Sequence, residues 1–237
     1  MTAPHFFVPS VASDRVSLTG DEARHAARVL RITPGESVTI SDGRGTVVEG
    51  VVTDAAASKV DVEVRARRFV EAARPTVVVY PAIPKAGKLD FVVQKLTELG
   101  VDRIAPWVAA RSVVRWDAAK VRTNGDRWRA IAWESSKQSR RAWLPQVDDP
   151  TGFPDVAEGT LVLHEEATVS MRAALPGPGA EVIFIVVGPE GSLDAAEIDR
   201  FVAKGAMPVT LGPTILRTET ASIVGAALAL AAGERLG

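Results

Sequence analysis

Cysteine is absent from the 237 residues of this chain, so disulfide bonds, thiolate metal sites and a cysteine nucleophile are excluded. The absence fits a reducing compartment, and we expect a cytoplasmic protein. Only three histidines are present, His5, His25 and His164, and they lie far apart in the sequence. We therefore expect no metal site.

Long apolar runs are also missing. The longest extends from Ala221 to Gly233 and contains Ser222, which makes it too short to span a bilayer and predicts a buried helix. The first residues lack the basic start and apolar centre of a signal peptide, so we expect neither a signal peptide nor a membrane-bound protein.

A strong net charge is missing as well, since the formal charge is −1. Taken alone, this argues against a nucleic-acid-binding protein. The charges are nevertheless segregated: residues 1–74 are neutral, 75–150 carry +5 and 151–237 carry −6. All five tryptophans lie within the basic segment, where cations interleaved with aromatic rings suit contact with RNA. Each tryptophan taken singly is more typical of a core, so the RNA interpretation rests on the basic surface.

Two patterns divide the chain. Residues 1–70 contain short alternating runs and one helical stretch at 20–31, which predict a small β-barrel with one helix. From residue 75 to 237 strands alternate with helices, which predicts an α/β domain with a mostly parallel sheet. The expected strands of this second domain are 76–82, 101–108, 160–164, 181–187 and 208–211, and the expected helices are 91–99, 127–139, 194–204 and 220–232.

Polar turns follow three of these strands. His164 and Glu165 come at the end of the strand expected at 160–164. The Gly-Pro-Glu-Gly turn from Gly188 to Gly191 follows the strand expected at 181–187. A polar cluster from Arg217 to Thr220 comes soon after the strand expected at 208–211. Loops at the carboxyl ends of parallel strands are where α/β folds bind ligands. Each motif also has a purely structural alternative. His164 and Glu165 can belong to a solvated loop, and Gly188 to Gly191 can form an ordinary strand–helix turn. Thr218, Glu219 or Thr220 can cap the final helix. Neither a dinucleotide-binding fingerprint nor a Walker-type phosphate loop is present.

Several motifs, taken together and in order, resemble the RsmE family of 16S ribosomal RNA (uracil-N3) methyltransferases within the SPOUT superfamily. The resemblance covers essentially the whole chain. One departure is visible: the family usually has Gly-Pro-Glu-Gly-Gly, whereas Ser192 follows Gly191 here. The motifs are His25 with Val29–Arg31, Lys85–Asp90, Gln94–Val101, Arg111–Val113, Gln138–Arg140 with Pro145, Gly188–Gly191 and Leu216–Ala221.

The resemblance implies a PUA-like barrel that helps to hold RNA, followed by a SPOUT domain with a C-terminal trefoil knot. It also implies a homodimer that binds S-adenosylmethionine in the knot and acts on 16S rRNA of the small ribosomal subunit. The residues expected to bind the cofactor are Leu163, His164, Glu165, Gly188, Pro189, Glu190, Gly191, Leu211, Gly212, Ile215, Leu216, Thr218, Thr220 and Ala221. The residues expected to contact RNA are His25, Arg28, Arg31, Lys85, Arg111, Lys137, Gln138, Arg140 and Arg141.

Arg217 and Glu219 are the expected catalytic residues. Uracil N3 carries a proton at neutral pH, so it is a poor nucleophile until that proton is lost. A fixed cation at Arg217 can stabilise negative charge on the base, while Glu219 can orient the base or accept the proton.

Two alternative functions remain. One is ribose 2′-O methylation, although the last loop usual in the 2′-O-methyltransferases of this superfamily, Ser-Leu-Asn-Val-Ser, differs from the sequence found here. A non-catalytic RNA-binding or ribosome-assembly factor is the other.

Overall fold

The chain folds into two units. The computed structural model describes residues 3–84, 87–112, 117–177 and 179–236. One unit comprises residues 1–72 and 136–144, and the other comprises residues 73–135 and 145–237. The sequence predicts a division between residues 70 and 75, with all of 75–237 in the second domain. The structure differs in one segment, because residues 136–144 pack with the first unit.

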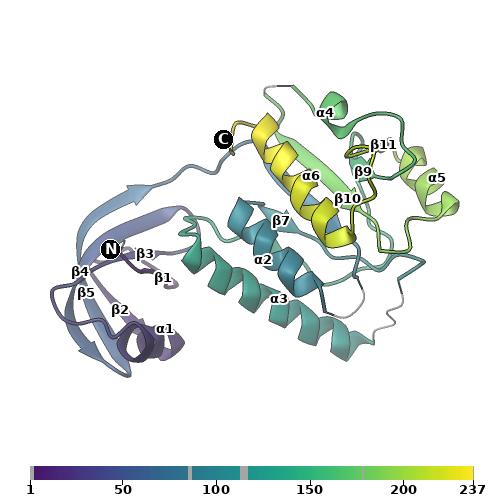
Figure 1. Ribbon diagram of the computed structural model, residues 1–237. Coiled ribbons are helices and arrows are strands. Elements are labelled where there is room, and N and C mark those ends of the chain that lie inside the picture. Colours follow the sequence, from purple (N-terminus) through teal and green to yellow (C-terminus); the bar gives the residue numbers. More distant parts are fainter. Residues whose placement is uncertain (1–2, 85–86, 113–116, 178, 237) are drawn as a thin grey trace. The chain divides into compact units, whose positions relative to one another are not determined.

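The N-terminal unit is built on a five-stranded sheet with the order β1-β3-β4-β5-β2 (Figure 1). Only the β1–β3 pair is parallel, and the other pairs are antiparallel. Buried apolar side chains such as Leu18, Ile40 and Val60 alternate with exposed ones and form its core together with Ala23 and Ala26. Its elements are β1 (His5–Phe7), β2 (Arg15–Thr19), α1 (Gly20–Arg24), a π-helical turn (His25–Val29), β3 (Ser37–Ser41), β4 (Thr46–Ala56) and β5 (Lys59–Phe69).

Hydrogen bonds to backbone carbonyls attach the segment 136–144 to this unit. The Ala142 carbonyl accepts from the Gly45 amide at 3.0 Å and from the Ser41 hydroxyl at 3.1 Å. Trp143 donates its indole N–H to the Val70 carbonyl at 2.8 Å. A Cβ on Gly45 would lie 2.7 Å from the Trp143 ring, so only glycine permits this close approach.

The second unit contains a six-stranded, all-parallel sheet with the order β11-β9-β10-β6-β7-β8. The sheet is consistent with the continuous apolar runs of β6 and β10, which are typical of strands covered on both faces. This confirms the predicted parallel α/β architecture. The strands are β6 (Thr76–Pro81), β7 (Arg103–Ile104), β8 (Gln146–Val147), β9 (Leu161–Leu163), β10 (Val182–Val187) and β11 (Met207–Val209).

Helices cover both faces of this sheet. Val77 and Val79 of β6 belong to a core that includes side chains of α2, α3 and α6, and α2 and α6 lie side by side (Figure 1). Val78 and Tyr80 point to the opposite face, where Phe201 of α5 is fully buried. The helices are α2 (Leu89–Leu99), α3 (Ala118–Gln138), α4 (Met171–Ala174), α5 (Ala195–Ala203) and α6 (Thr218–Ala232).

Two expected elements have different extents. The strand predicted at 101–108 is reduced to β7, because Pro106 has no backbone N–H to continue the ladder; Trp107 forms only isolated bridges beyond it. The helix predicted at 20–31 ends earlier, since Arg31 has a positive φ of 55°, and Leu30 is 43% exposed rather than packed. No helix among the described residues is long and apolar enough to cross a membrane.

Arg235 fastens the end of the second unit to its sheet. Its guanidinium donates to both carboxylate oxygens of Asp102, at 2.6 and 3.1 Å, and to the carbonyls of Pro75 and Gly100. Asp102 in turn accepts from the Val77 amide at 2.7 Å. The Arg235 side chain is only 11% exposed, so this ion pair is largely protected from solvent.

We predict that Arg235→Ala lowers the free energy of unfolding by about 3 kcal/mol, because it leaves Asp102 and two carbonyls without their partner. Urea unfolding followed by tryptophan fluorescence measures the change, since Trp107 and Trp128 are buried in this unit. The exposed Arg172→Ala on α4 is the control and should change stability by less than about 0.5 kcal/mol. Equal effects of the two substitutions would contradict the prediction.

Candidate functional site

Three loops of the second unit converge at one edge of its sheet. Strands β11, β9 and β10 are neighbours, and Leu163 at the end of β9 is in register with Val187 of β10 and Val209 of β11. The carboxyl ends of the three strands are therefore level. Because ligands bind α/β sheets at this edge, the loops after these strands form the candidate site.

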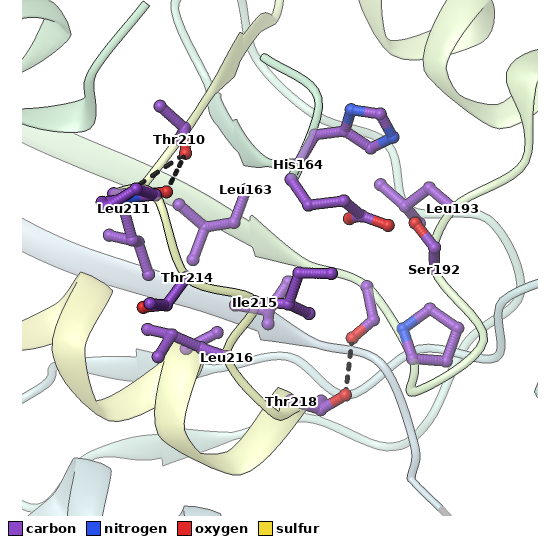
Figure 2. A pocket seen from close by; sticks show the side chains of 17 residues that line it. Leu163, His164, Ser192, Leu193, Thr210, Leu211, Thr214, Ile215, Leu216 and Thr218 are labelled. Atoms are coloured by element: carbon purple, nitrogen blue, oxygen red, sulfur yellow. Dashed lines mark hydrogen bonds between the residues drawn. The ribbon is translucent and has the colours of Figure 1, made fainter. Parts of the chain in front are cut away.

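A cavity that is partly open to solvent lies between these loops, and its empty space together with the adjoining solvent is about 620 Å³ (Figure 2). Eleven of the fourteen residues expected to bind the cofactor line it. The exceptions are Glu190, Gly191 and Thr220. The eleven are Leu163, His164, Glu165, Gly188, Pro189, Leu211, Gly212, Ile215, Leu216, Thr218 and Ala221.

Six further residues line the cavity beyond those expected to bind the cofactor. Pro213 and Thr214 lie between the expected residues Gly212 and Ile215. The other four lie within two positions of an expected residue, so extending the motifs by two positions includes them. Figure 2 shows Ser192 and Leu193 on the side of His164, and Thr210 and Thr214 near Leu211. The six are Val187, Ser192, Leu193, Thr210, Pro213 and Thr214.

The turn after β10 is shaped by its small residues. A Cβ on Gly188 would lie 2.9 Å from Leu193, so this position has little room for a side chain. Ser192 has a φ of 60°, a left-handed conformation that glycine adopts most easily. A glycine, which is usual at this position in the RsmE pattern, would adopt this conformation at less cost than Ser192. Asp194 then begins α5 with a capping box to Glu197.

The first turn of α6 is joined to that loop by Thr218. Its hydroxyl donates to the Gly188 carbonyl at 3.0 Å, and its own carbonyl accepts from the Ser222 hydroxyl at 2.8 Å. Arg217 occupies the N-cap position and provides no side-chain cap. The Thr218 side chain thus connects two walls of the cavity, which is a different role from helix capping.

Arg217 and Glu219 do not line the cavity but flank Thr218, which does. Arg217 is exposed. Glu219 is only 16% exposed and pairs with Lys88, whose ammonium lies 3.2 Å from Glu219 Oε1. Lys88 also lies 3.9 Å from Glu190 Oε1, so the three side chains form a charged cluster beside the cavity.

Two carboxylates of the site are held in the ionised form. Burial opposes ionisation of Glu219, but its own backbone amide together with the nearby Lys88 and Arg217 outweigh this effect and lower its pKa. Burial likewise opposes ionisation of Glu165, and hydrogen bonds from Ser192 and its own amide lower its pKa. The site thus offers negative charge both in the cavity and beside it.

The N-terminal unit brings together two groups of expected RNA contacts that are distant in sequence. Glu22 of α1 pairs with Lys137 at 3.0 Å, which places 137–141 near the helical turn of His25 and Arg28. Lys137 is only 10% exposed, so it is engaged in this structural pair. Arg28, Arg31, Gln138 and Arg140 are exposed, whereas His25 and Arg141 are half-buried.

The basic segment of the second unit is partly neutralised by its own acids. Arg127 pairs with Asp90, and Arg129 pairs with Asp126 and Asp149. Trp107 and Trp128 are buried, so neither ring is available for stacking on RNA. Arg111 donates to the Gly191 carbonyl at 3.0 Å beside the cavity. Three of the residues considered above, Lys85, Val113 and Trp116, lie outside the described residues.

No cluster of three or more possible metal ligands occurs within the part of the chain that the structure describes. The lining of the candidate site combines apolar side chains such as Leu163 and Leu216 with polar ones such as Glu165 and Thr210.

Comparisons with known proteins agree with this organisation. Residues 71–230 match a family model described as an RNA methyltransferase domain, and residues 18–65 match one described as an RNA methyltransferase PUA domain. The ribosomal RNA small subunit methyltransferase E of Mycobacterium tuberculosis is 41% identical over 218 residues, which cover 86% of this chain and 82% of that protein. The Bacillus subtilis protein of the same name is 32% identical over 220 residues, which cover 87% and 86%.

Solved structures extend the likeness to the whole fold. The Neisseria gonorrhoeae ribosomal RNA small subunit methyltransferase E bound to S-adenosyl methionine has a TM-score of 0.86 at 26% identity, covering 97% of this chain and 98% of that one. A putative methyltransferase from Legionella pneumophila, in complex with the cofactor SAM, has a TM-score of 0.87 at 25% identity, covering 98% of both. The chain therefore belongs to the ribosomal RNA small subunit methyltransferase E (RsmE) family.

Proposed function

We propose that this protein transfers the methyl group of S-adenosylmethionine to N3 of a specific uridine in 16S rRNA of the small ribosomal subunit. The observation that carries the proposal is the cavity formed by the loops after β9, β10 and β11, in a chain whose relatives include methyltransferases solved with this cofactor.

The residues of the cavity fit this cofactor. Leu163, Leu211 and Leu216 offer apolar surface for a purine, and the glycine and proline turns offer backbone groups for the adenine and ribose. The ionised Glu165 suits a positively charged ligand. When bound, the cofactor supplies an electrophilic methyl group. The protein then has to position the nucleophile and assist the loss of its proton.

Arg217 and Glu219 would act on the uracil. The fixed positive charge of Arg217 stabilises the negative charge that develops on the base as the N3 proton leaves. Glu219, whose pKa is lowered, is ionised at neutral pH and accepts a hydrogen bond from N3–H, which orients the base; the proton can pass to it as the methyl group is transferred. Because N3 lies on the Watson–Crick edge, the uridine must be unpaired or turned out of its helix.

The N-terminal unit would hold the RNA. Exposed Arg28, Arg31 and Arg140 suit phosphates, and the half-buried His25 and Arg141 belong to the same unit. Arg111 would contribute beside the cavity. The expectations of a C-terminal trefoil knot, a homodimer and a cytoplasmic location belong to this proposal too, since each follows from the RsmE resemblance and from a ribosomal RNA substrate.

We predict that Thr218→Val weakens binding of S-adenosylhomocysteine about tenfold, because it removes the hydrogen bond that holds the Gly188 carbonyl in the cavity wall. Isothermal calorimetry measures the effect. Thr53→Val is a matched control, since it also removes one hydroxyl-to-carbonyl hydrogen bond, from an exposed strand of the other unit. No heat of binding to the wild type would refute cofactor binding itself and favour a non-catalytic RNA-binding factor.

We predict that Arg217→Ala and Glu219→Gln each reduce methyl transfer about a hundredfold at saturating cofactor, because each removes an interaction with the reacting base. Single-turnover transfer to 16S rRNA, with the product nucleoside identified by mass spectrometry, is the measurement. Near-normal rates in both variants would remove these residues from the mechanism. A 2′-O-methylated product would refute the assignment of N3.

We predict that the double substitution Arg28→Gln, Arg31→Gln weakens RNA binding and reduces the slope of log K against log salt by about 1.8, since two phosphate contacts would be lost. Fluorescence anisotropy at several salt concentrations measures this slope. Cofactor binding, which takes place in the other unit, should be unchanged. An unaltered slope would exclude the turn at residues 25–31 from the RNA interface.

A further inference from the structure

Lys88 joins three separate parts of the second unit. It stands at the N-cap of α2, and its ammonium lies 3.2 Å from Glu219 of α6 and 3.9 Å from Glu190 of the loop after β10. Both carboxylates are next in the chain to residues that line the cavity, Thr218 and Pro189. The cluster therefore lies immediately beside the proposed cofactor site.

The two carboxylate oxygens of Glu219 have different surroundings. Oε1 accepts a hydrogen bond from Lys88. Oε2 is fully buried and has no hydrogen-bond partner among the residues that the structure describes. A buried acceptor without a partner costs about 1–3 kcal/mol, and more when it is charged. Such a group beside a ligand cavity is explained if the bound substrate provides the missing donor.

We infer that Lys88 is a positioning residue of the methyl-transfer reaction: it holds one oxygen of Glu219 so that the other, ionised, can accept from the imide N–H of the target uracil when the bound substrate uncovers it. This inference rests on the proposed function, because it takes Glu219 to act on the base. It assigns Lys88 a role through Glu219 and no direct contact with the substrate.

The charges around Glu219 explain why this cation matters. Lys88 and Arg217 favour its ionised form, and Arg217 is exposed and thus more strongly screened by solvent. Glu190 is the like charge on the other side of Lys88. Without Lys88, burial and Glu190 would both favour the protonated acid, so the pKa of Glu219 would rise.

The protonation state of Glu219 also bears on which base is accepted. Uracil presents a donor at N3, whereas cytosine presents an acceptor there. An ionised carboxylate accepts from the uracil N–H and repels the cytosine lone pair, while a protonated one offers a donor instead. By keeping Glu219 ionised, Lys88 would support selection of uracil as well as the reaction rate.

The test compares Lys88→Met, Lys88→Arg and the control Lys95→Met in single-turnover methylation of 16S rRNA between pH 5.5 and 8. Lys95 is on the same helix, is similarly exposed at 34% against 37%, and pairs with Glu98 instead. We expect the ratio of the Lys88→Met rate to the wild-type rate to be about tenfold lower at pH 5.5 than at pH 8. The reason is that the pKa of Glu219 is raised in this variant, so its carboxylate becomes protonated as the pH drops. Lys88→Arg should restore the wild-type profile, and Lys95→Met should keep it.

A purely structural role would lower the rate of Lys88→Met by the same factor at every pH, and that result would overturn the inference. Affinity for S-adenosylhomocysteine should stay within about twofold of the wild type, which shows that the cavity is intact. The double variant Lys88→Met, Glu219→Gln should be no slower than Glu219→Gln alone, because both substitutions act on one group. Additive losses would equally overturn the inference.

The same series separates failure of the inference from failure of the proposed function. If Glu219→Gln methylates uridine at the wild-type rate, the proposed role of Glu219 is wrong, and the inference about Lys88 falls with it. If Glu219→Gln is slow but Lys88→Met keeps the wild-type pH profile, the proposed function stands and only the positioning role of Lys88 is refuted.

Discussion

The site depends on the register in which β9 pairs with both of its neighbours. With Leu163 in register with Val187 and Val209, three loops leave the sheet at the same level and can enclose one ligand. A shift of β9 by one residue would turn its buried side chains to the opposite face and displace His164 and Glu165 from the cavity. The hydrogen bond from Thr218 to Gly188 then fixes the start of α6 against the loop after β10. The residues proposed for binding and catalysis are placed by the strand register and this hydrogen bond.

Much of this arrangement could be predicted from the sequence, because the decisive signals are local. The apolar run of β10 ending at Gly188, and polar residues following β9, are sufficient to predict ligand loops at one edge of a parallel sheet. Lining residues beyond the ends of the motifs, such as Leu193 and Thr210, were missed because their side chains face the cavity only through the course of the loops. The short strand β8 escapes prediction because two residues carry no periodicity, and its pairing is decided by the chain around it.

Long-range pairing is what the sequence could not supply. The basic segment suggested a surface available to RNA, yet several of its cations are paired with acids distant in the chain, such as Arg129 with Asp149 and Lys137 with Glu22. The concentration of tryptophans likewise has more than one cause. Trp107 and Trp128 belong to the core of the second unit, while Trp143 packs in the first. The cluster of Lys88, Glu190 and Glu219 combines residues up to 131 positions apart, so no sequence motif could identify it.

The segment 136–144 has a consequence for how this protein can be divided. Because it belongs to the first unit while the residues before and after it belong to the second, the peptide chain passes between the units three times. No single cut yields both units complete. A fragment ending at residue 72 would lack the Ala142 carbonyl and the Trp143 ring that pack on Gly45, and the remainder would carry that ring without its surroundings. Replacement of the first unit by engineering must therefore transfer two pieces of sequence together.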